Sequence, residues 1–134
     1  MQIEGKSPEQ MFKDIDDNSN GYAMPGWETE RMPEIKELFE KYKGVTSDDL
    51  WNNLKYFLDA IMPVCEECDV KMAIHPDDPP WDIFGLPRII KDRESLKKLL
   101  EIVPSKYNGL TFCTGSLGAS SKNDLPAMIR EFGD

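Results

Sequence analysis

Hydrophobic and polar positions along this chain follow the patterns of helices joined to short buried strands. Four segments place apolar residues at helical spacing, and two short segments are almost wholly apolar, as buried strands are. The order is helix, helix, strand, helix, strand, helix. This alternation predicts an α/β fold.

The N-terminal part of the chain predicts little regular structure before the first helix. Residues 1–27 contain several turn-forming residues and are expected to be irregular. A short helix is predicted to begin near Pro33 and to end before Gly44. Its expected apolar face consists of Ile35, Leu38, Phe39 and Tyr42.

A longer helix is predicted next, with Ser47 as its N-terminal cap. We expect it to run to about Met62 or one turn beyond, because Pro63 can end or kink a helix. Its apolar stripe consists of Leu50, Leu54, Phe57, Leu58, Ile61, Met62 and Cys65.

Two strands are predicted, at residues 70–74 and 109–112, with a helix over 92–103 between them. Asp92 is the expected cap of that helix. The strands should be adjacent and parallel, because a helix connects them.

The last helix is predicted to follow the glycine-bearing loop Thr114 to Gly118. Asn123 is its expected cap, and Gly133 marks its end. The residues expected on its inner face are Leu125, Met128, Ile129 and Phe132.

His75 and Cys113 each follow one of the two predicted strands. The carboxyl ends of parallel strands share one edge of a sheet, so both side chains are candidates for one metal ion. Two ordinary alternatives remain for these residues. A histidine at a strand end is often only hydrogen-bonded, and a cysteine after an apolar run is often a small core residue.

Cys65 and Cys68 form a C-x-x-C pair. A zinc or redox pair would need further ligands or a matching motif, and Cys65 falls on the apolar stripe of a helix. The sequence therefore favours buried thiols at both positions.

Composition narrows the functional classes. The chain has 134 residues with a net charge of −9, which argues against nucleic acid or an anionic membrane as the main partner. No apolar stretch reaches about 18 residues, the length typical of a membrane span. An odd count of three cysteines suits a reducing compartment, so we expect a cytoplasmic protein.

Two strings carry a family resemblance: "MAIHPDDPPWDIFGLPRI" and "NGLTFCTGSLGASSKNDLPAMIREFG". They resemble mannonate dehydratase, a family related to the xylose-isomerase-like (β/α)8 barrels. The match extends through roughly residues 48–133. It implies a lyase that dehydrates D-mannonate to 2-keto-3-deoxy-D-gluconate in glucuronate catabolism.

The resemblance also implies a metal site and a partial barrel. Such enzymes bind a divalent ion, Mn(II) or alternatively Fe(II), through one Cys, two His and one Asp. His75 matches the first histidine and Cys113 the cysteine, while the second histidine and the aspartate are expected beyond the end of this sequence. We therefore expect residues 1–134 to be a single internal segment of a partial TIM barrel. Residues 1–46 would supply irregular structure and a short helix, and residues 47–134 two βα units.

Dehydration of a sugar acid requires a cation for the developing oxyanion and an acid for the leaving hydroxide. The identity of the general acid or base is open. Asp77 and Asp78 are candidates to orient His75 or to bind sugar hydroxyls. Their alternative is an Asx-type turn before the prolines.

Arg88 is a candidate for the substrate carboxylate, and its alternative is a surface ion pair. Ser116 can bind a carboxylate or hydroxyl, although the glycines around it are explained equally well by a plain turn. Trp81 and Phe84 either line a pocket or form a small core of the loop.

The leading prediction is a mannonate dehydratase segment that binds a sugar acid, in a homo-oligomer, with neither nucleic acid nor membrane as partner. One alternative is another metal-dependent sugar isomerase or epimerase of the same barrel type. The other is a non-catalytic fragment.

Overall fold

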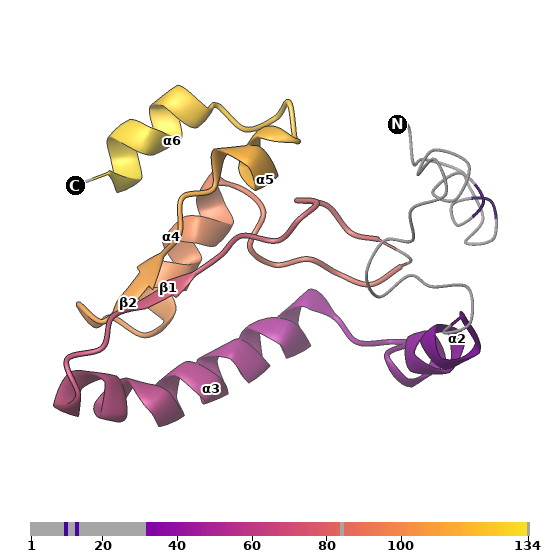
Figure 1. Ribbon diagram of the computed structural model, residues 1–134, viewed down its shortest axis with the longest axis horizontal. Coiled ribbons are helices and arrows are strands. Elements are labelled where there is room, and N and C mark those ends of the chain that lie inside the picture. The colour runs from indigo at the N-terminus through magenta and orange to yellow at the C-terminus, as the bar shows by residue number, and fades with distance from the viewer. Residues whose placement is uncertain (1–9, 11–12, 14–31, 84, 134) are drawn as a thin grey trace. The chain divides into compact units, whose positions relative to one another are not determined.

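The computed structural model describes residues 10, 13, 32–83 and 85–133 (Figure 1). Of residues 1–27, which were predicted to be irregular, the structure describes Gln10 and Lys13, and both are helical. The remainder of that segment and the candidate Phe84 lie outside the described residues. The chain divides into two compact units, Met1–Lys43 and Gly44–Asp134, and each is described by itself.

In the first unit, helix α2 spans Met32–Lys41 and confirms the short helix predicted there. The chain leaves this helix toward Gly44, whose φ of +89° lies in the region that glycine adopts without steric cost. Of the predicted apolar face, Leu38 is 49% exposed and Tyr42 51% exposed. These two side chains are therefore less buried than the pattern predicted.

The second unit begins with helix α3, Ser47–Glu67, whose cap is Thr46 rather than the predicted Ser47. The Thr46 hydroxyl accepts the Asp49 N–H at 3.2 Å, and the Asp49 carboxylate accepts the Thr46 N–H at 2.9 Å. This reciprocal pair satisfies two of the free N–H groups at the helix start. Pro63 lies inside α3 and does not end it.

One face of α3 enters the core, through Trp51, Leu58, Met62 and Cys65. Trp51 was not predicted on this face, and the prediction of Phe57 there is wrong, since Phe57 is 50% exposed. Successive residues of a helix point about 100° apart around its axis. Phe57, which precedes the core residue Leu58, therefore points away from the core.

Two short strands, β1 (Met72–Ile74) and β2 (Asn108–Leu110), pair in parallel and confirm the predicted neighbours. Met72 lies opposite Asn108, and Ile74 lies opposite Leu110. Figure 1 shows the strands side by side with α4 next to them. Together with the helices, this parallel pair confirms an α/β fold.

The strands are shorter than predicted, and hydrogen bonds explain both differences. The Val70 N–H donates to the Cys65 carbonyl at 2.9 Å, so the backbone at Val70 is bonded to the last turn of α3 rather than to the sheet. After β2, the Thr111 N–H still bonds to Ile74 at 2.8 Å, but Cys113 N–H turns back to the Thr111 carbonyl. The backbone therefore leaves the sheet before Cys113.

Helix α4, Arg93–Ile102, connects the strands and begins at Asp92 as predicted. Leu96 and Leu99 on this helix are fully buried. At its other end, the buried Asn108 amide donates to the carbonyls of Leu99 and Val103 at 2.9 and 3.0 Å. The first residue of β2 thus satisfies carbonyls that the helix end leaves free.

Two helices follow β2. The segment predicted as a loop forms the short helix α5, Thr114–Gly118, and α6 spans Leu125–Phe132. The cap of α6 is Asp124, which accepts the Ala127 N–H at 3.1 Å, rather than the predicted Asn123. Ile129, predicted to face inward, is 47% exposed.

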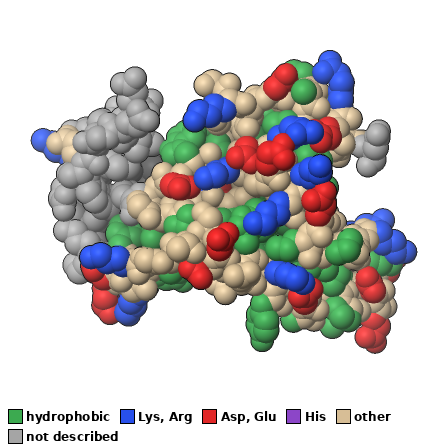
Figure 2. All heavy atoms as spheres, turned by 180° about the vertical axis from the view of Figure 1, so that it is seen from behind, with side chains coloured by type: hydrophobic (Ala, Val, Ile, Leu, Met, Phe, Trp, Pro, Cys, Tyr) green, Lys and Arg blue, Asp and Glu red, His purple; other side chains and the backbone are tan. Residues whose placement is uncertain are grey.

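The core of the second unit joins α3, α4, α5 and α6 through Leu58, Leu96, Leu117 and Met128. On the face shown in Figure 2, acidic and basic side chains lie interspersed over the surface. Among the described residues, no helix has both the length and the apolar character needed to cross a bilayer.

Leu96→Ala should destabilise the chain by about 2–5 kcal/mol, because a fully buried leucine leaves a cavity when it is truncated. Urea unfolding followed by circular dichroism measures the change. Phe57→Ala is the matched control on the half-exposed side of α3 and should cost less than about 1 kcal/mol. Equal losses in the two variants would contradict this description of the core.

Candidate metal centre

The parallel strands bring the two predicted metal ligands to one edge of the sheet. His75 directly follows β1, and Cys113 caps α5 shortly after β2. The two side chains lie close enough for each to shift the pKa of the other. The predicted proximity of these residues is therefore confirmed.

The imidazole of His75 is held by its own backbone. Its Nδ1 lies 2.7 Å from the Pro76 carbonyl, and since a carbonyl only accepts, Nδ1 carries the proton. In the neutral ring, Nε2 then carries the lone pair, so it is the ring atom that can bind a metal. The pKa of His75 is raised, first by the Pro76 carbonyl and then by Cys113, with a smaller contribution from the charge of Asp78.

Donors from Ser116 surround the Cys113 sulfur. The Ser116 hydroxyl lies 3.3 Å from Sγ, and the Ser116 N–H lies 3.5 Å from it. These two contacts, followed by the nearby imidazole of His75, lower the pKa of Cys113 to about 7. A large share of the thiol is therefore thiolate near neutral pH, which is the form that binds metals.

Asp77 and Arg88 contact each other across the loop between β1 and α4. Arg88 Nη1 lies 3.3 Å from Asp77 Oδ1, so the alternative of an ion pair for Arg88 is the arrangement seen. The other carboxylate oxygen of Asp77 accepts the N–H groups of Ile89 and Ile90, both at 2.9 Å. The Asx-type turn considered for Asp77 is wrong, because the carboxylate bonds to Ile89 and Ile90 at the far end of the loop and not to the residues that follow it directly.

Each of the three predicted substrate-binding residues, Asp77, Arg88 and Ser116, thus has partners within the chain. Ser116 is only 2% exposed, and its hydroxyl faces Cys113. Their roles toward a substrate stay predictions.

The donor pair fits a divalent ion with mixed nitrogen, sulfur and oxygen ligands. One imidazole nitrogen and one activated thiolate lie together at the half-exposed sheet edge. Among the described residues, no group of three or more His, Cys, Asp or Glu side chains is arranged to hold a metal ion. The described part of the chain therefore offers an incomplete ligand set.

The C-x-x-C motif takes no part in this centre. Cys65 is buried, as predicted, whereas Cys68 is exposed, which corrects the prediction of two buried thiols. Cys68 follows the last turn of α3, where its N–H bonds to the Val64 carbonyl. Both thiols are free.

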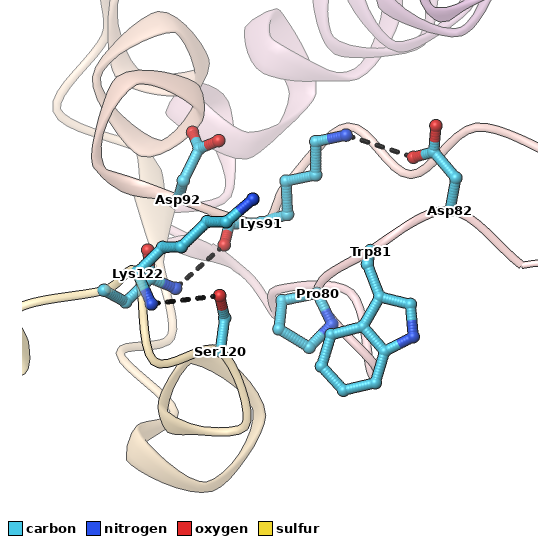
Figure 3. A pocket seen from close by; sticks show the side chains of 8 residues that line it. Pro80, Trp81, Asp82, Lys91, Asp92, Ser120 and Lys122 are labelled. Carbon is cyan, nitrogen blue, oxygen red and sulfur yellow. Dashed lines mark hydrogen bonds and ion pairs between the residues drawn. The ribbon is translucent and has the colours of Figure 1, made fainter. Parts of the chain in front are cut away.

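A separate pocket of about 450 Å³ lies between the loop after β1 and the turn after α5. Figure 3 shows Pro80 and Trp81 on one side and Ser120 and Lys122 on the other. Trp81 therefore lines a pocket, although neither His75 nor Cys113 does. Asp82 and Lys91 in its wall pair at 3.0 Å.

Two groups near the candidate ligands have roles that the sequence did not predict. The Pro76 carbonyl could not be found, because a backbone oxygen leaves no mark in the sequence. Asn123 had the signal of a helix cap but donates instead to the carbonyls of Lys91 and Leu117, at 3.0 and 2.9 Å. It links the loop that follows β1 to the helix that follows β2.

Comparison with known proteins identifies the family of the chain. The sequence model of the D-mannonate dehydratase (UxuA) family matches residues 1–134. The mannonate dehydratase of Thermotoga maritima is 55% identical over 131 residues, covering 98% of this chain and 36% of the relative. That of Enterococcus faecalis is 56% identical over 131 residues, covering 98% and 37%.

A solved structure supports the same relationship. The crystal structure of mannonate dehydratase from Streptococcus suis serotype 2 has a TM-score of 0.65 and 50% sequence identity, and covers 67% of this chain and 26% of that one. The chain belongs to the D-mannonate dehydratase family. It spans about 36% of the length of the curated relatives that it matches.

In the metal-free chain, alkylation of Cys113 by iodoacetamide should rise with pH around a midpoint near 7, because the thiolate is the nucleophile. Ser116→Ala removes the strongest donor to Sγ, so the midpoint should move to higher pH and the rate at pH 7 should fall several-fold. Mass spectrometry of the modified peptide gives the rate.

Cys113→Ala is the control that reports the exposed Cys68 alone. An identical pH profile for Cys113 in the parent chain and in Ser116→Ala would contradict the role given to the serine.

Proposed function

We propose that this chain is part of an enzyme that dehydrates D-mannonate to 2-keto-3-deoxy-D-gluconate with Mn(II), or alternatively Fe(II), as cofactor. The observation that carries the proposal is the His75 and Cys113 pair at one sheet edge, in a chain of the D-mannonate dehydratase family. The reaction is a step of glucuronate breakdown, and we place it in the cytoplasm.

We further propose that the two βα units are part of a (β/α)8 barrel and that both compact units of the chain belong to it. Adjacent parallel strands joined by a helix are the repeating element of such a barrel, and active sites lie at the carboxyl ends of its strands. His75 and Cys113 lie at those ends. We expect the complete protein to be a homo-oligomer.

His75 would hold the ion through Nε2, since Nδ1 donates to Pro76. Cys113 would hold it through a thiolate that Ser116 stabilises. When bound, the ion supplies positive charge that stabilises the oxyanion formed as a proton leaves the carbon next to the carboxylate. His75 is exposed and Cys113 is half-buried, so a group held by these two side chains would be open to a substrate.

Binding of the sugar acid draws on the loop after β1. Arg88 offers a guanidinium that is 31% exposed and can bind a carboxylate while it keeps its single contact with Asp77. Asp77 and Ser116 are secondary candidates, because their acceptor and donor atoms already have partners.

In the family-length enzyme that contains this segment, His75→Ala and Cys113→Ala should remove most of the bound metal and most dehydratase activity. The fold should be kept, because neither side chain belongs to the buried core. Metal content by mass spectrometry and a D-mannonate assay measure the two effects.

Cys65→Ala and Cys68→Ala are the matched controls and should keep metal and activity, with a modest loss of stability for the buried Cys65. Equal manganese in all four variants would show that His75 and Cys113 are not ligands.

The 134-residue chain alone should not be an active dehydratase, because its described residues supply an incomplete ligand set. In the test, the purified chain is mixed with Mn(II) and D-mannonate, and the rate at which the keto-deoxy acid forms is measured. Turnover within about tenfold of a typical enzyme's roughly 10 per second would overturn this expectation.

A further inference from the structure

One peptide group connects the candidate ligand His75 to the far end of the loop that follows it. The carbonyl of the Pro76–Asp77 peptide accepts the His75 Nδ1–H at 2.7 Å. The N–H of the same peptide donates to the Ile90 carbonyl at 2.8 Å. Because a peptide group is planar, its bond to Ile90 also fixes the direction in which its oxygen meets the imidazole.

The carboxylate of Asp77 makes further bonds between the start and the end of the same loop. It accepts the N–H groups of Ile89 and Ile90 at 2.9 Å each and contacts Arg88 at 3.3 Å. Asp77 and Ile90 therefore exchange bonds in both directions. The Asp77 side chain is only 23% exposed, so water competes weakly for these bonds.

The far end of this connection is itself anchored. Ile90 is 5% exposed and belongs to the core, and Lys91 and Asp92 lead directly into the capped start of α4. The position of the Pro76 carbonyl is thereby fixed relative to the buried core, although His75 itself is exposed.

We propose that Asp77 is a positioning residue for His75: by holding the Pro76–Asp77 peptide against Ile90, it keeps the proton on Nδ1 and presents Nε2 to the metal. The assignment of a metal to Nε2 rests on the proposed function, whereas the state of the ring does not. This role goes beyond packing, because it determines which of the two ring nitrogens is free.

A control residue of the same type lies in the same loop. Asp82 also accepts one backbone N–H, from Arg88 at 2.9 Å, and contacts one cation, Lys91 at 3.0 Å. Its bonds do not involve the peptide that holds His75. Loss of Asp82 therefore reports general loosening of the loop.

His75 is the single histidine of the chain, so its ring nitrogens give unambiguous ¹⁵N NMR signals. The spectra are recorded on the metal-free chain at a pH where the imidazole is neutral. The parent chain should show Nδ1 protonated and Nε2 unprotonated. Asp77→Ala should lose this preference and show a mixture of both tautomers.

Asp77→Asn keeps an oxygen that can accept both backbone N–H groups and should retain the tautomer of the parent chain. Asp82→Ala should retain it as well. If Asp77→Ala is unfolded by circular dichroism, Asp77→Ser takes its place, because its hydroxyl reaches at most one of the two N–H groups.

A parent-like tautomer in folded Asp77→Ala or Asp77→Ser would overturn the proposal. The same loss in Asp82→Ala would also overturn it, since the loop as a whole would then be responsible.

Titration with Mn(II) alone, followed by electron paramagnetic resonance, is the second measurement. In the family-length protein, Asp77→Ala should bind Mn(II) about 10- to 100-fold more weakly than Asp82→Ala. Equal Mn(II) affinity in these variants would overturn the effect of Asp77 on the metal. If the NMR result holds but the parent protein binds no Mn(II), the proposed function fails and the positioning of the ring stands.

Discussion

The parallel pairing of β1 with β2 is the constraint on which the site depends. The two strands contribute three residues each, and their register aligns Ile74 with Leu110. This register brings a histidine and a cysteine from distant parts of the sequence to one edge. Such short strands hold their register because core helices pack beside them, with Leu58, Leu96 and Leu99 fully buried.

Around that edge, local hydrogen bonds decide what each donor can do. A carbonyl acceptor fixes the proton of the imidazole on one nitrogen, and a serine hydroxyl and N–H favour the charged form of the thiol. Different groups therefore set the protonation of the two side chains. For His75 it is the backbone of the next residue, and for Cys113 it is the first turn of α5.

Much of this arrangement could be predicted from the sequence. Short apolar runs predicted the strands, and the rule that parallel strands share a carboxyl edge predicted the meeting of His75 with Cys113. The capping residues of two helices were predicted one position away from those observed, because two adjacent residues in each case can act as an N-terminal cap. Thr46 and Ser47 can both cap a helix, as can Asn123 and Asp124, and the extended backbone at Thr46 decided the first of these.

The rest could not be predicted because it depends on partners far apart in sequence. Asp77 meets Ile89 and Ile90 only after the loop has folded back on itself. The α5 turn was hidden by its glycines, which indicated a loop, while the buried Leu117 holds it in the core. In both cases tertiary contacts overrode a local signal.

The amide of Asn123 has a consequence for the entropy of assembling the centre. It joins the Lys91 carbonyl, at the end of the loop carrying His75, to the Leu117 carbonyl in the helix carrying Cys113. These two bonds restrict the motion of one segment relative to the other, and with it the relative motion of the imidazole and the thiol. Part of the conformational entropy that is lost in bringing these two side chains together is then lost when the chain folds.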